Sequence, residues 1–377
     1  MIEKQKTVGI LSMQRVANYG SFLQAWALRQ MLRAAGADVY FIDIRPGRQL
    51  KGYEFGDGRH RWRRLAELTG ALLCGRLGAK MRGRKFYRTM RARYRTEYYA
   101  MLGLDRVLPL RLDVAVIGSD QVFNALERTP WGFTAQLFGD IPEADKVVSY
   151  AASFGGATLA ELQRTGVADE IASNLAHLAA ISVRDEHSAE LVCALTGREA
   201  VRHLDPVLVY DFTAELEGRT SGERDYIVVY SYPERIANRA EIEAIRAFAA
   251  TRGKRLVSIL ATYDWCDEAV QPATPFDVLA WFRDADYIVT DTFHGTIFSI
   301  ITERLFCTLV RDSNASRLSS LLDGLGLGAH AATSSAEIIK ILDTKPDYAP
   351  VREIIKREKH RAEEYLAEVL GIDNYKL

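Results

Sequence analysis

Short apolar runs alternate with amphipathic helical stretches from the start of the chain. Residues 7–12 (TVGILS) are apolar nearly throughout and predict a strand, and residues 21–35 carry apolar side chains at helical spacing. Gly36 is placed to end that helix, because glycine accepts the left-handed conformation that helix ends use. Residues 38–44 (DVYFIDI) predict the next strand. A strand, a helix and a second strand form a βαβ unit, which implies a parallel sheet.

The same alternation resumes later in the chain and then starts a second time. Further strands are expected at 113–118, 146–151 and 180–184. A new series begins at residue 226, with strands expected at 226–231, 286–290 and 305–310 and helices at 235–251 and 275–284. The polar stretch 212–225 contains two glycines and is the predicted linker. We therefore predict an α/β protein with two Rossmann-like domains facing a cleft, with ligands at the carboxyl ends of the strands. The expected domains are residues 1–215, with a basic helical insertion at about 50–110, and residues 222–377, with a long terminal helix.

Charge is balanced over the whole chain but concentrated locally. The 377 residues contain 49 Lys or Arg and 49 Asp or Glu, which excludes a chain that is basic throughout. The segment from Arg45 to Arg106, however, has 17 basic and 5 acidic residues. Trp62 and neighbouring leucines predict an apolar stripe beside Arg63 and Arg64. Two interpretations stay open: a solvated pair of Arg-rich helices, or a surface for an anionic membrane or a diphosphate-linked glycan acceptor.

The N-terminal region and the basic segment also narrow the choice of location and partners. The first residues lack the long apolar core of a secretory signal, and no run of 18 apolar residues predicts a membrane span. The basic segment contains no recognisable nucleic-acid module. We expect a cytoplasmic protein without a nucleic-acid partner, and a peripheral position at the inner face of the cytoplasmic membrane follows if the membrane interpretation holds.

Small polar residues and glycines follow several predicted strands of the first half. Such loops present backbone N–H groups to phosphates or carboxylates, and the helix after the first loop adds its dipole. Ser21 is the expected cap of that helix, and a capped helix start with a tight turn remains the alternative for this loop. No G-x-G-x-x-G pattern is present, so a dinucleotide site is not predicted. The candidate binding residues are Asn18, Tyr19, Gly20, Ser119, Asp120, Gln121, Ser153, Phe154 and Gly155.

Arg184 stands at the end of the predicted strand 180–184. Its guanidinium could pair with Asp185 or Glu186, which follow it directly. The alternative is a bidentate clamp on the phosphate or carboxylate of a ligand.

The most informative polar sequence is TDTFHGT at residues 290–296. It follows the apolar strand DYIVT and opens a helix, which puts His294 at the ligand side of the second sheet. Imidazole at this place can give or take a proton near neutral pH, and Asp291 could orient the ring. The alternative is a histidine that only bonds the start of the helix. Gly295 and Thr296 complete the site.

Arg317 extends this candidate site. A cation at the start of a helix is opposed by the helix dipole, so an anion-binding role is predicted for Arg317. No metal-ligand cluster, nucleophile elbow or P-loop is recognisable, and no metal site is expected.

Several of these stretches together resemble the polysaccharide pyruvyl transferase family. The resemblance runs in order from Val8 to about Leu327 and omits Lys51 to Leu112. The stretches are VGILSMQRVANYGSFLQAWAL, DVAVIGSDQVFN, SYAASFGG, ISVRDEHSAELV, LDPVLVY, DYIVTDTFHGTIFSIITERLFCTLV and SRLSSLLDGLGL.

The resemblance implies a GT-B-like fold and transfer of pyruvate from phosphoenolpyruvate, as co-substrate without a further cofactor, to a sugar. The product is a cyclic ketal on a bacterial surface polysaccharide, such as an exopolysaccharide or capsule, or on its lipid-linked precursor. It also implies that His294 is the general acid/base and that Arg184 holds the donor. Many members carry Arg where this chain has Thr292, so Arg317 or Arg311 would have to supply that charge.

Two other functions stay open at this stage. A GT-B glycosyltransferase that uses a nucleotide sugar would share the fold. A non-catalytic glycan-binding relative is permitted by the Thr292 departure. Phosphoenolpyruvate itself suits the arginines and helix starts found above, because it carries both a carboxylate and a phosphate.

Overall fold

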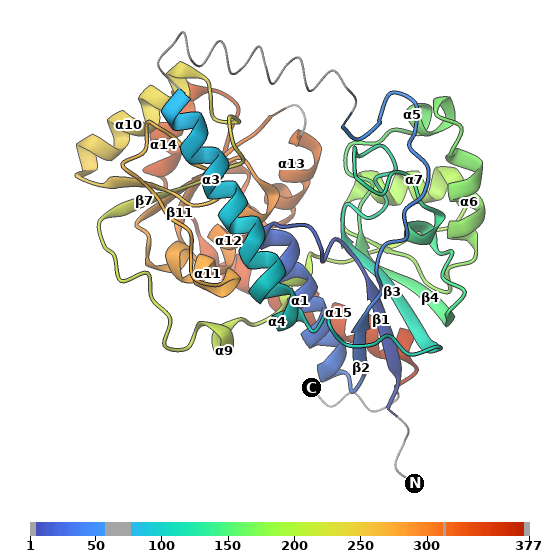
Figure 1. Cartoon of the computed structure of the whole chain (residues 1–377). Coiled ribbons are helices and arrows are strands. Elements are labelled where there is room, and N and C mark those ends of the chain that lie inside the picture. The colour runs from blue at the N-terminus through green and yellow to red at the C-terminus, as the bar shows by residue number, and fades with distance from the viewer. Residues whose placement is uncertain (1–4, 57–76, 312–313, 373–377) are drawn as a thin grey trace. The chain divides into compact units, whose positions relative to one another are not determined.

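The chain folds into two compact units. The computed structural model describes residues 5–56, 77–311 and 314–372. Contacts divide the chain into unit 1, which is Met1–Phe55, Tyr99–Tyr210 and Ile354–Leu377, and unit 2, which is Gly56–Tyr98 and Asp211–Glu353. Figure 1 shows both units with their helices and strands.

This division differs in two places from the ranges inferred from the sequence. The terminal helix was assigned to the second domain, but its later part packs with unit 1, where the Tyr365 hydroxyl donates to the Ser149 carbonyl at 2.7 Å. The basic insertion was assigned to the first domain, but residues 77–98 pack with unit 2, where the Tyr98 hydroxyl donates to the Ala273 carbonyl at 2.9 Å. Both differences come from contacts between residues more than 170 positions apart, which local patterns do not encode.

Unit 1 is built on a parallel sheet in the order β2-β1-β3-β4-β5-β6. Its strands are β1 (Thr7–Leu11), β2 (Asp38–Phe41), β3 (Leu112–Asp120), β4 (Ala144–Ala152), β5 (Ser182–Val183) and β6 (Val201–Arg202). Its helices are α1 (Tyr19–Ala34), α4 (Tyr99–Leu102), η2 (Ala135–Phe138), α5 (Leu159–Arg164), α6 (Ala168–Ala176), α7 (Glu186–Thr196) and α8 (Pro206–Val209). Helix α15 (Tyr348–Leu370) belongs to unit 1 from Ile354 on.

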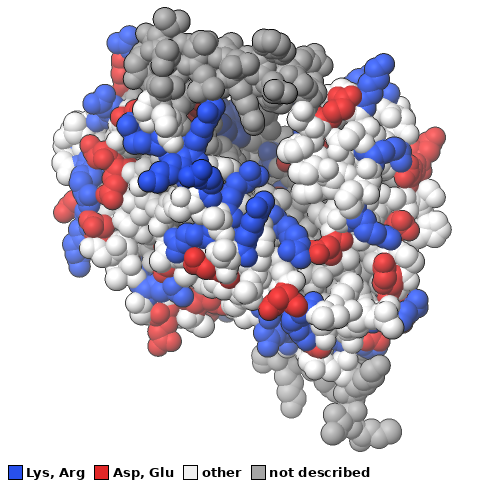
Figure 2. All heavy atoms as spheres, in the orientation of Figure 1, with Lys and Arg blue, Asp and Glu red and all other residues white. Residues whose placement is uncertain are grey.

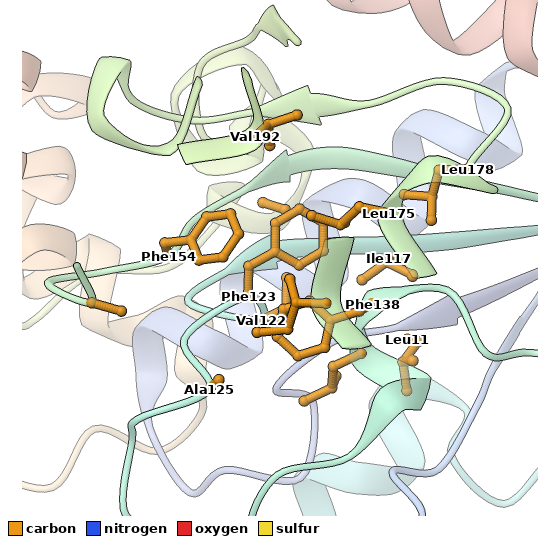
Figure 3. Packing of buried hydrophobic residues seen from close by; sticks show 14 of the residues in the cluster. Leu11, Ile117, Val122, Phe123, Ala125, Phe138, Phe154, Leu175, Leu178 and Val192 are labelled. Carbon is orange, nitrogen blue, oxygen red and sulfur yellow. The ribbon is translucent and has the colours of Figure 1, made fainter. Parts of the chain in front are cut away.

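The core of unit 1 explains why its central strands read as continuous apolar runs. Strands β3 and β4 are covered on both faces, as parallel sheets require. One face packs against α6 and α7, where aromatic rings meet aliphatic side chains (Figure 3). Phe123 is at the centre, with ring centroids 5.6 Å from Phe138 and 5.3 Å from Phe154. This packing fixes the loops that leave the carboxyl ends of β3 and β4.

Unit 2 repeats the architecture with a parallel sheet in the order β12-β11-β10-β7-β8-β9. Its strands are β7 (Tyr226–Tyr230), β8 (Arg255–Ser258), β9 (Glu268–Ala269), β10 (Tyr287–Thr290), β11 (Leu305–Leu309) and β12 (Ala331–Ala332). Its helices are α3 (Leu77–Arg93), the π-helical turn η1 (Tyr94–Tyr98), α9 (Thr213–Leu216), α10 (Arg239–Arg252), α11 (Pro275–Asp284), α12 (Phe293–Ile301), α13 (Ala315–Gly324), η3 (Gly328–His330), η4 (Ser335–Glu337) and α14 (Ile338–Leu342). The predicted class, two α/β domains with parallel sheets, is confirmed.

Two helix starts differ from their predictions, and caps explain both. Helix α1 begins at Tyr19, two residues before the expected start, because the Asn18 side chain accepts from the Gly20 N–H and caps the helix in place of Ser21. Helix α10 begins at Arg239 because Asn238 caps it in the same way. Arg235, expected at the start of that helix, therefore lies in the loop after β7.

Candidate functional site

The polar cluster of unit 1 is centred on Asp205, which follows β6. Its carboxylate is fully buried and accepts from the Val207 N–H at 3.0 Å. The same carboxylate takes a hydrogen bond of 2.9 Å from Arg184 and one of 2.7 Å from Gln24. The Arg184 side chain is only 3% exposed. The sequence offered two alternatives for Arg184, a pair with Asp185 or Glu186 and a ligand clamp. In the structure its guanidinium bonds Asp205.

Helix α1 and the end of β3 are tied into this cluster. Gln24 donates to the Ser119 hydroxyl at 2.9 Å, and the Ser21 hydroxyl donates to Asp120 at 3.0 Å. Asp120 also lies 4.0 Å from the Arg184 guanidinium. The predicted residues Ser119, Asp120 and Arg184 are therefore brought together. Gln24 was not predicted, and only its position one turn into α1 could have indicated it.

The loop after β4 has a structural explanation. Ser153 is fully buried and donates to Asp185 at 2.7 Å, and the Phe154 ring lies in the core (Figure 3). Gly155 has a positive φ of 63°, and a Cβ there would lie 2.2 Å from the Gln121 side-chain oxygen. This close approach places the loops after β3 and β4 against each other. The predicted residues Gln121, Ser153, Phe154 and Gly155 are thus neighbours.

The start of α1 provides the third edge of the cluster. Tyr19 is buried and Asn18 caps the helix, as described above. The N–H group of Gly20 is occupied by the Asn18 side chain at 2.7 Å. The capped helix start with a tight turn is therefore the arrangement seen, and the remaining first-turn N–H groups carry the positive end of the helix dipole.

The candidate site of unit 2 contains His294 on the first turn of α12. Thr292 caps this helix by accepting from the Gly295 N–H at 2.9 Å, and His294 is its second residue. The imidazole is 9% exposed and has the rings of Phe293 and Phe298 beside it, with centroids 5.7 and 6.1 Å away. The histidine thus combines a helix N-terminus with apolar walls.

Glycine and small hydroxyl residues are required around His294 by the close packing. A Cβ at Gly295 would lie 2.2 Å from the Thr290 hydroxyl and 2.7 Å from the Thr292 hydroxyl. Thr296 is fully buried and bonds the Thr292 carbonyl at 3.0 Å. The predicted Gly295 and Thr296 therefore hold the first turn of α12 against the end of β10.

Asp291 is a buried anion of this site. It is fully buried and accepts from the Ser231 hydroxyl at 2.6 Å. Its other oxygen pairs with the Arg235 guanidinium at 2.8 Å. Strands β7 and β10 are neighbours, which brings Ser231 beside Asp291 although 60 residues separate them. Asp291 therefore links two strand ends and fixes an arginine.

The arginines near Asp291 differ in their ion-pair partners and in their exposure to solvent. Arg311, after β11, makes a bidentate pair with Glu241 at 2.5 and 2.8 Å, which raises the pKa of Arg311. Arg235 is 33% exposed and pairs with Asp291 through Nε. Sequence reasoning missed Arg235, and its place four residues after an apolar strand was the available signal. Arg317 is the third residue of α13.

Some predicted features lie outside these clusters. Trp62, Arg63 and Arg64 fall outside the described residues. Within the described part of the chain, no helix is both long and apolar enough to cross a membrane. The same part holds no group of three or more His, Cys, Asp or Glu side chains placed to bind a metal ion.

Three solved structures align with nearly the whole of this chain. A putative UDP-N-acetylglucosamine 2-epimerase of Listeria monocytogenes aligns over 98% of both chains with 12% identity and a TM-score of 0.51. UGT89C1 of Arabidopsis thaliana, in complex with quercetin, aligns over 97% of this chain and 100% of its own, with 12% identity and a TM-score of 0.49. An O-GlcNAc transferase mutant of Thermobaculum terrenum aligns over 98% of this chain, with 16% identity and a TM-score of 0.40. This chain covers 65% of that protein, less than two thirds of its length.

The likeness to the epimerase concerns the fold, which is of the GT-B type with two parallel-sheet α/β domains. No curated protein matches the sequence. The family model for polysaccharide pyruvyl transferases, by contrast, matches residues 18–313, which include both polar clusters. The chain therefore belongs to the polysaccharide pyruvyl transferase family.

Proposed function

We propose that this protein transfers the pyruvyl group of phosphoenolpyruvate to two hydroxyls of a sugar and so forms a cyclic ketal. The acceptor is a bacterial surface polysaccharide or its lipid-linked precursor. The observation that carries the proposal is the position of His294, on the first turn of α12 directly after β10, in a chain of this family. A histidine there is held by a helix start and has apolar walls, which suits proton transfer to carbon.

The reaction needs one proton at carbon and one leaving phosphate. His294 passes a proton to C3 of the enol while a sugar hydroxyl adds to C2. Phosphate then leaves with the C–O bonding electrons. The second hydroxyl adds to C2 and loses its proton, which closes the ketal. The two hydroxyl protons thus balance the proton gained at C3 and the proton released with phosphate.

Arginines supply the positive charge that the donor and the leaving phosphate require. Arg184 is held ready by Asp205 in unit 1, and we assign it to an anionic group of the donor. In unit 2, Arg235 supplies the charge that many family members place at the position of Thr292. The Asp291 pair orients Arg235, whereas Glu241 already neutralises Arg311. Asp291 is then a positioning residue for Arg235.

The test is turnover with defined substrates. The full chain is incubated with phosphoenolpyruvate and a panel of glycans, and phosphate release is measured together with the mass gained by each glycan. Pyruvylation predicts both signals in equal amounts. A His294→Ala variant that is folded, as judged by its circular dichroism, should lose about 10²–10⁴-fold in rate. Normal turnover by that variant would remove His294 from the mechanism.

The two alternative functions give different outcomes in the same experiment. A glycosyltransferase would leave phosphoenolpyruvate intact and would add a sugar mass when a nucleotide sugar is supplied. A non-catalytic relative would bind a glycan and change neither substrate.

A further inference from the structure

Helix α3 presents a row of cations on its outer face. Arg84, Lys85, Arg88 and Arg91, here called the basic stripe, are all exposed. Positions 84, 88 and 91 lie on one side of the helix, because residues three and four apart share a face. No Asp or Glu of the described residues forms an ion pair with a member of the stripe. Residues 77–98 contain eight Lys or Arg and one Glu.

The inner face of α3 is fixed to unit 2. Met90 is buried, and the Gln271 side chain donates to the Phe86 carbonyl at 2.5 Å. Just beyond the stripe, Arg93 donates to the carbonyls of Pro272, at 3.1 Å, and Ala273. These bonds fix the rotation of the helix about its axis, so the stripe faces outward. Figure 2 shows Lys and Arg side chains gathered where α3 runs along unit 2 in Figure 1.

The contacts of α3 lie on the side of unit 2 that carries His294. Strands β8 and β9 run parallel to β7 and β10, so their carboxyl ends reach the same edge of the sheet. Helix α3 contacts the segments that follow these two ends: Arg82 pairs with Asp264 at 3.3 Å, and Gln271 bonds the helix as described. The stripe is therefore built beside the edge where unit 2 places its candidate site.

The shape and chemistry of the stripe indicate its ligand. A helix surface is convex, and the members of the stripe offer charge and hydrogen bonds only. Polymers such as single-stranded nucleic acids are bound in grooves with open aromatic platforms, whereas the Tyr87 ring on this face has the Arg91 guanidinium over it, 5.9 Å from its centroid. A flat anionic surface can contact all members of a convex row at once, and lipid phosphates match the guanidinium groups.

We propose that the basic stripe of α3 is a docking surface for an anionic lipid membrane. Contact at this face holds the His294 edge of unit 2 near lipid headgroups, where a lipid-linked acceptor would be presented. That use rests on the proposed function, but the lipid contact itself does not.

Vesicle sedimentation of the full chain tests the proposal. Wild-type protein is expected to sediment with vesicles that contain phosphatidylglycerol, to ignore vesicles of phosphatidylcholine alone, and to be released by salt. The triple variant Arg84→Ala, Lys85→Ala, Arg88→Ala should bind about a hundredfold more weakly, since each cation near a membrane contributes about fivefold. Alanine also favours the helix, so α3 should persist.

A matched control removes the same charge elsewhere on unit 2. Arg246, Lys340 and Lys345 are exposed and lie outside the stripe, and changing them together to alanine should alter vesicle binding less than threefold. Equal losses in both variants, or no binding by the wild type, would overturn the proposal. Binding of a soluble polyanion such as heparin through the stripe, without binding to vesicles, would assign the stripe to a polymer instead.

Activity measurements separate this proposal from the proposed function. With a soluble glycan acceptor, the stripe variant should turn over phosphoenolpyruvate at the wild-type rate. If the wild type binds vesicles but has no turnover with any acceptor, the lipid contact stands and the proposed function fails.

Discussion

Among the described residues, Asp205 in unit 1 and Asp291 in unit 2 are fully buried aspartates at strand ends, and the arginines paired with them differ in their exposure to solvent. Asp205 in unit 1 holds Arg184, whose side chain is 3% exposed. Asp291 in unit 2 holds Arg235, whose side chain is 33% exposed. Both aspartates also accept from a polar neighbour, Gln24 or Ser231. Both units thus pair a buried carboxylate with an arginine, and only in unit 2 is the arginine side chain partly exposed.

This difference in exposure indicates a structural role for the pair in unit 1 and a ligand-binding role for the arginine in unit 2. In unit 1 both members of the pair are buried, so losing Asp205 takes from Arg184 its closest carboxylate and leaves Asp120 at 4.0 Å. In unit 2 the arginine can be solvated when its partner is lost, and it can also turn to a ligand. We expect substitutions at the Asp205 cluster to act first on stability and those at the Asp291 cluster to act first on catalysis.

The largest effect is expected for Asp205→Ala. It leaves Arg184 buried without its closest carboxylate and removes one of the two acceptors of the Gln24 amide, the other being the Ser119 hydroxyl. We expect a loss of roughly 3–5 kcal/mol in the free energy of unfolding, measured by urea denaturation. The control is Asp145→Ala, which removes the exposed ion pair with Arg111 and should cost less than about 1 kcal/mol. Similar losses in the two variants would show that the Asp205 pair is not buried in solution.

Acidification provides the next test, through His203 after β6 in unit 1. The side chain is 3% exposed, and burial, with Arg361 adding to it, lowers the pKa of His203 to about 4. Below the pKa of an ordinary histidine, about 6.5, His203 is protonated in the unfolded chain but stays neutral in the folded chain. Stability is therefore full above that value and falls as the pH drops toward 4. Between about pH 7 and pH 5 the loss should be about 2 kcal/mol.

Urea denaturation at several pH values measures this slope. A His203→Gln variant, which keeps a hydrogen-bonding group for Ser182, should show a flatter dependence on pH. An unchanged slope would assign the acid sensitivity to other groups.

The third prediction is the counterpart of the first. Asp291→Ala removes the bond from Ser231 and frees Arg235, but the guanidinium can move into water. We expect a loss of about 1–2 kcal/mol in stability, together with a larger fall in the rate of pyruvyl transfer. The control Glu243→Ala breaks the exposed pair with Arg239 on α10 and should change neither quantity measurably. A loss of stability as large as that of Asp205→Ala would remove the distinction between the units.

The elements that hold these clusters could largely be predicted from the sequence. The apolar runs became β1, β3, β7, β10 and β11, and the predicted helix at 275–284 is α11 at the same residues. Periodicity reports burial of local segments, and burial in a parallel sheet is continuous along a strand. The position of His294 followed directly, since it depends only on a strand end and the next helix start.

The contacts that give the clusters their character could not be predicted in this way. Gln24 meets Asp205 across 181 residues, and Ser231 meets Asp291 across 60. Such partners are set by which strands become neighbours, and the order of a parallel sheet is not encoded in any one segment. Arg235 was assigned to a helix, because its neighbours fit the helical pattern and the Asn238 cap was overlooked. Asn314, which donates to the Asp291 carbonyl at 2.7 Å, was missed because 23 residues separate the two.

The smallest effect is expected when Arg235 and Arg311 of unit 2 are compared for their ability to bind the donor. Arg235→Gln removes the half-buried guanidinium paired with Asp291. Arg311→Gln removes one that Glu241 holds at 2.5 and 2.8 Å and that also lies 3.9 Å from Asp291. A charge-assisted bond to a donor anion is worth about 1.5–3 kcal/mol, so Arg235→Gln should raise the KM for phosphoenolpyruvate about tenfold. Arg311→Gln should raise it less than about threefold and should lower stability instead, because it leaves Glu241, only 9% exposed, without its partner. Arg235→Lys should restore part of the affinity, since it keeps the charge but loses the fork. If Arg311→Gln raises the KM more than Arg235→Gln does, then Arg235 has only a structural role, and the donor is held by Arg311 at the end of β11.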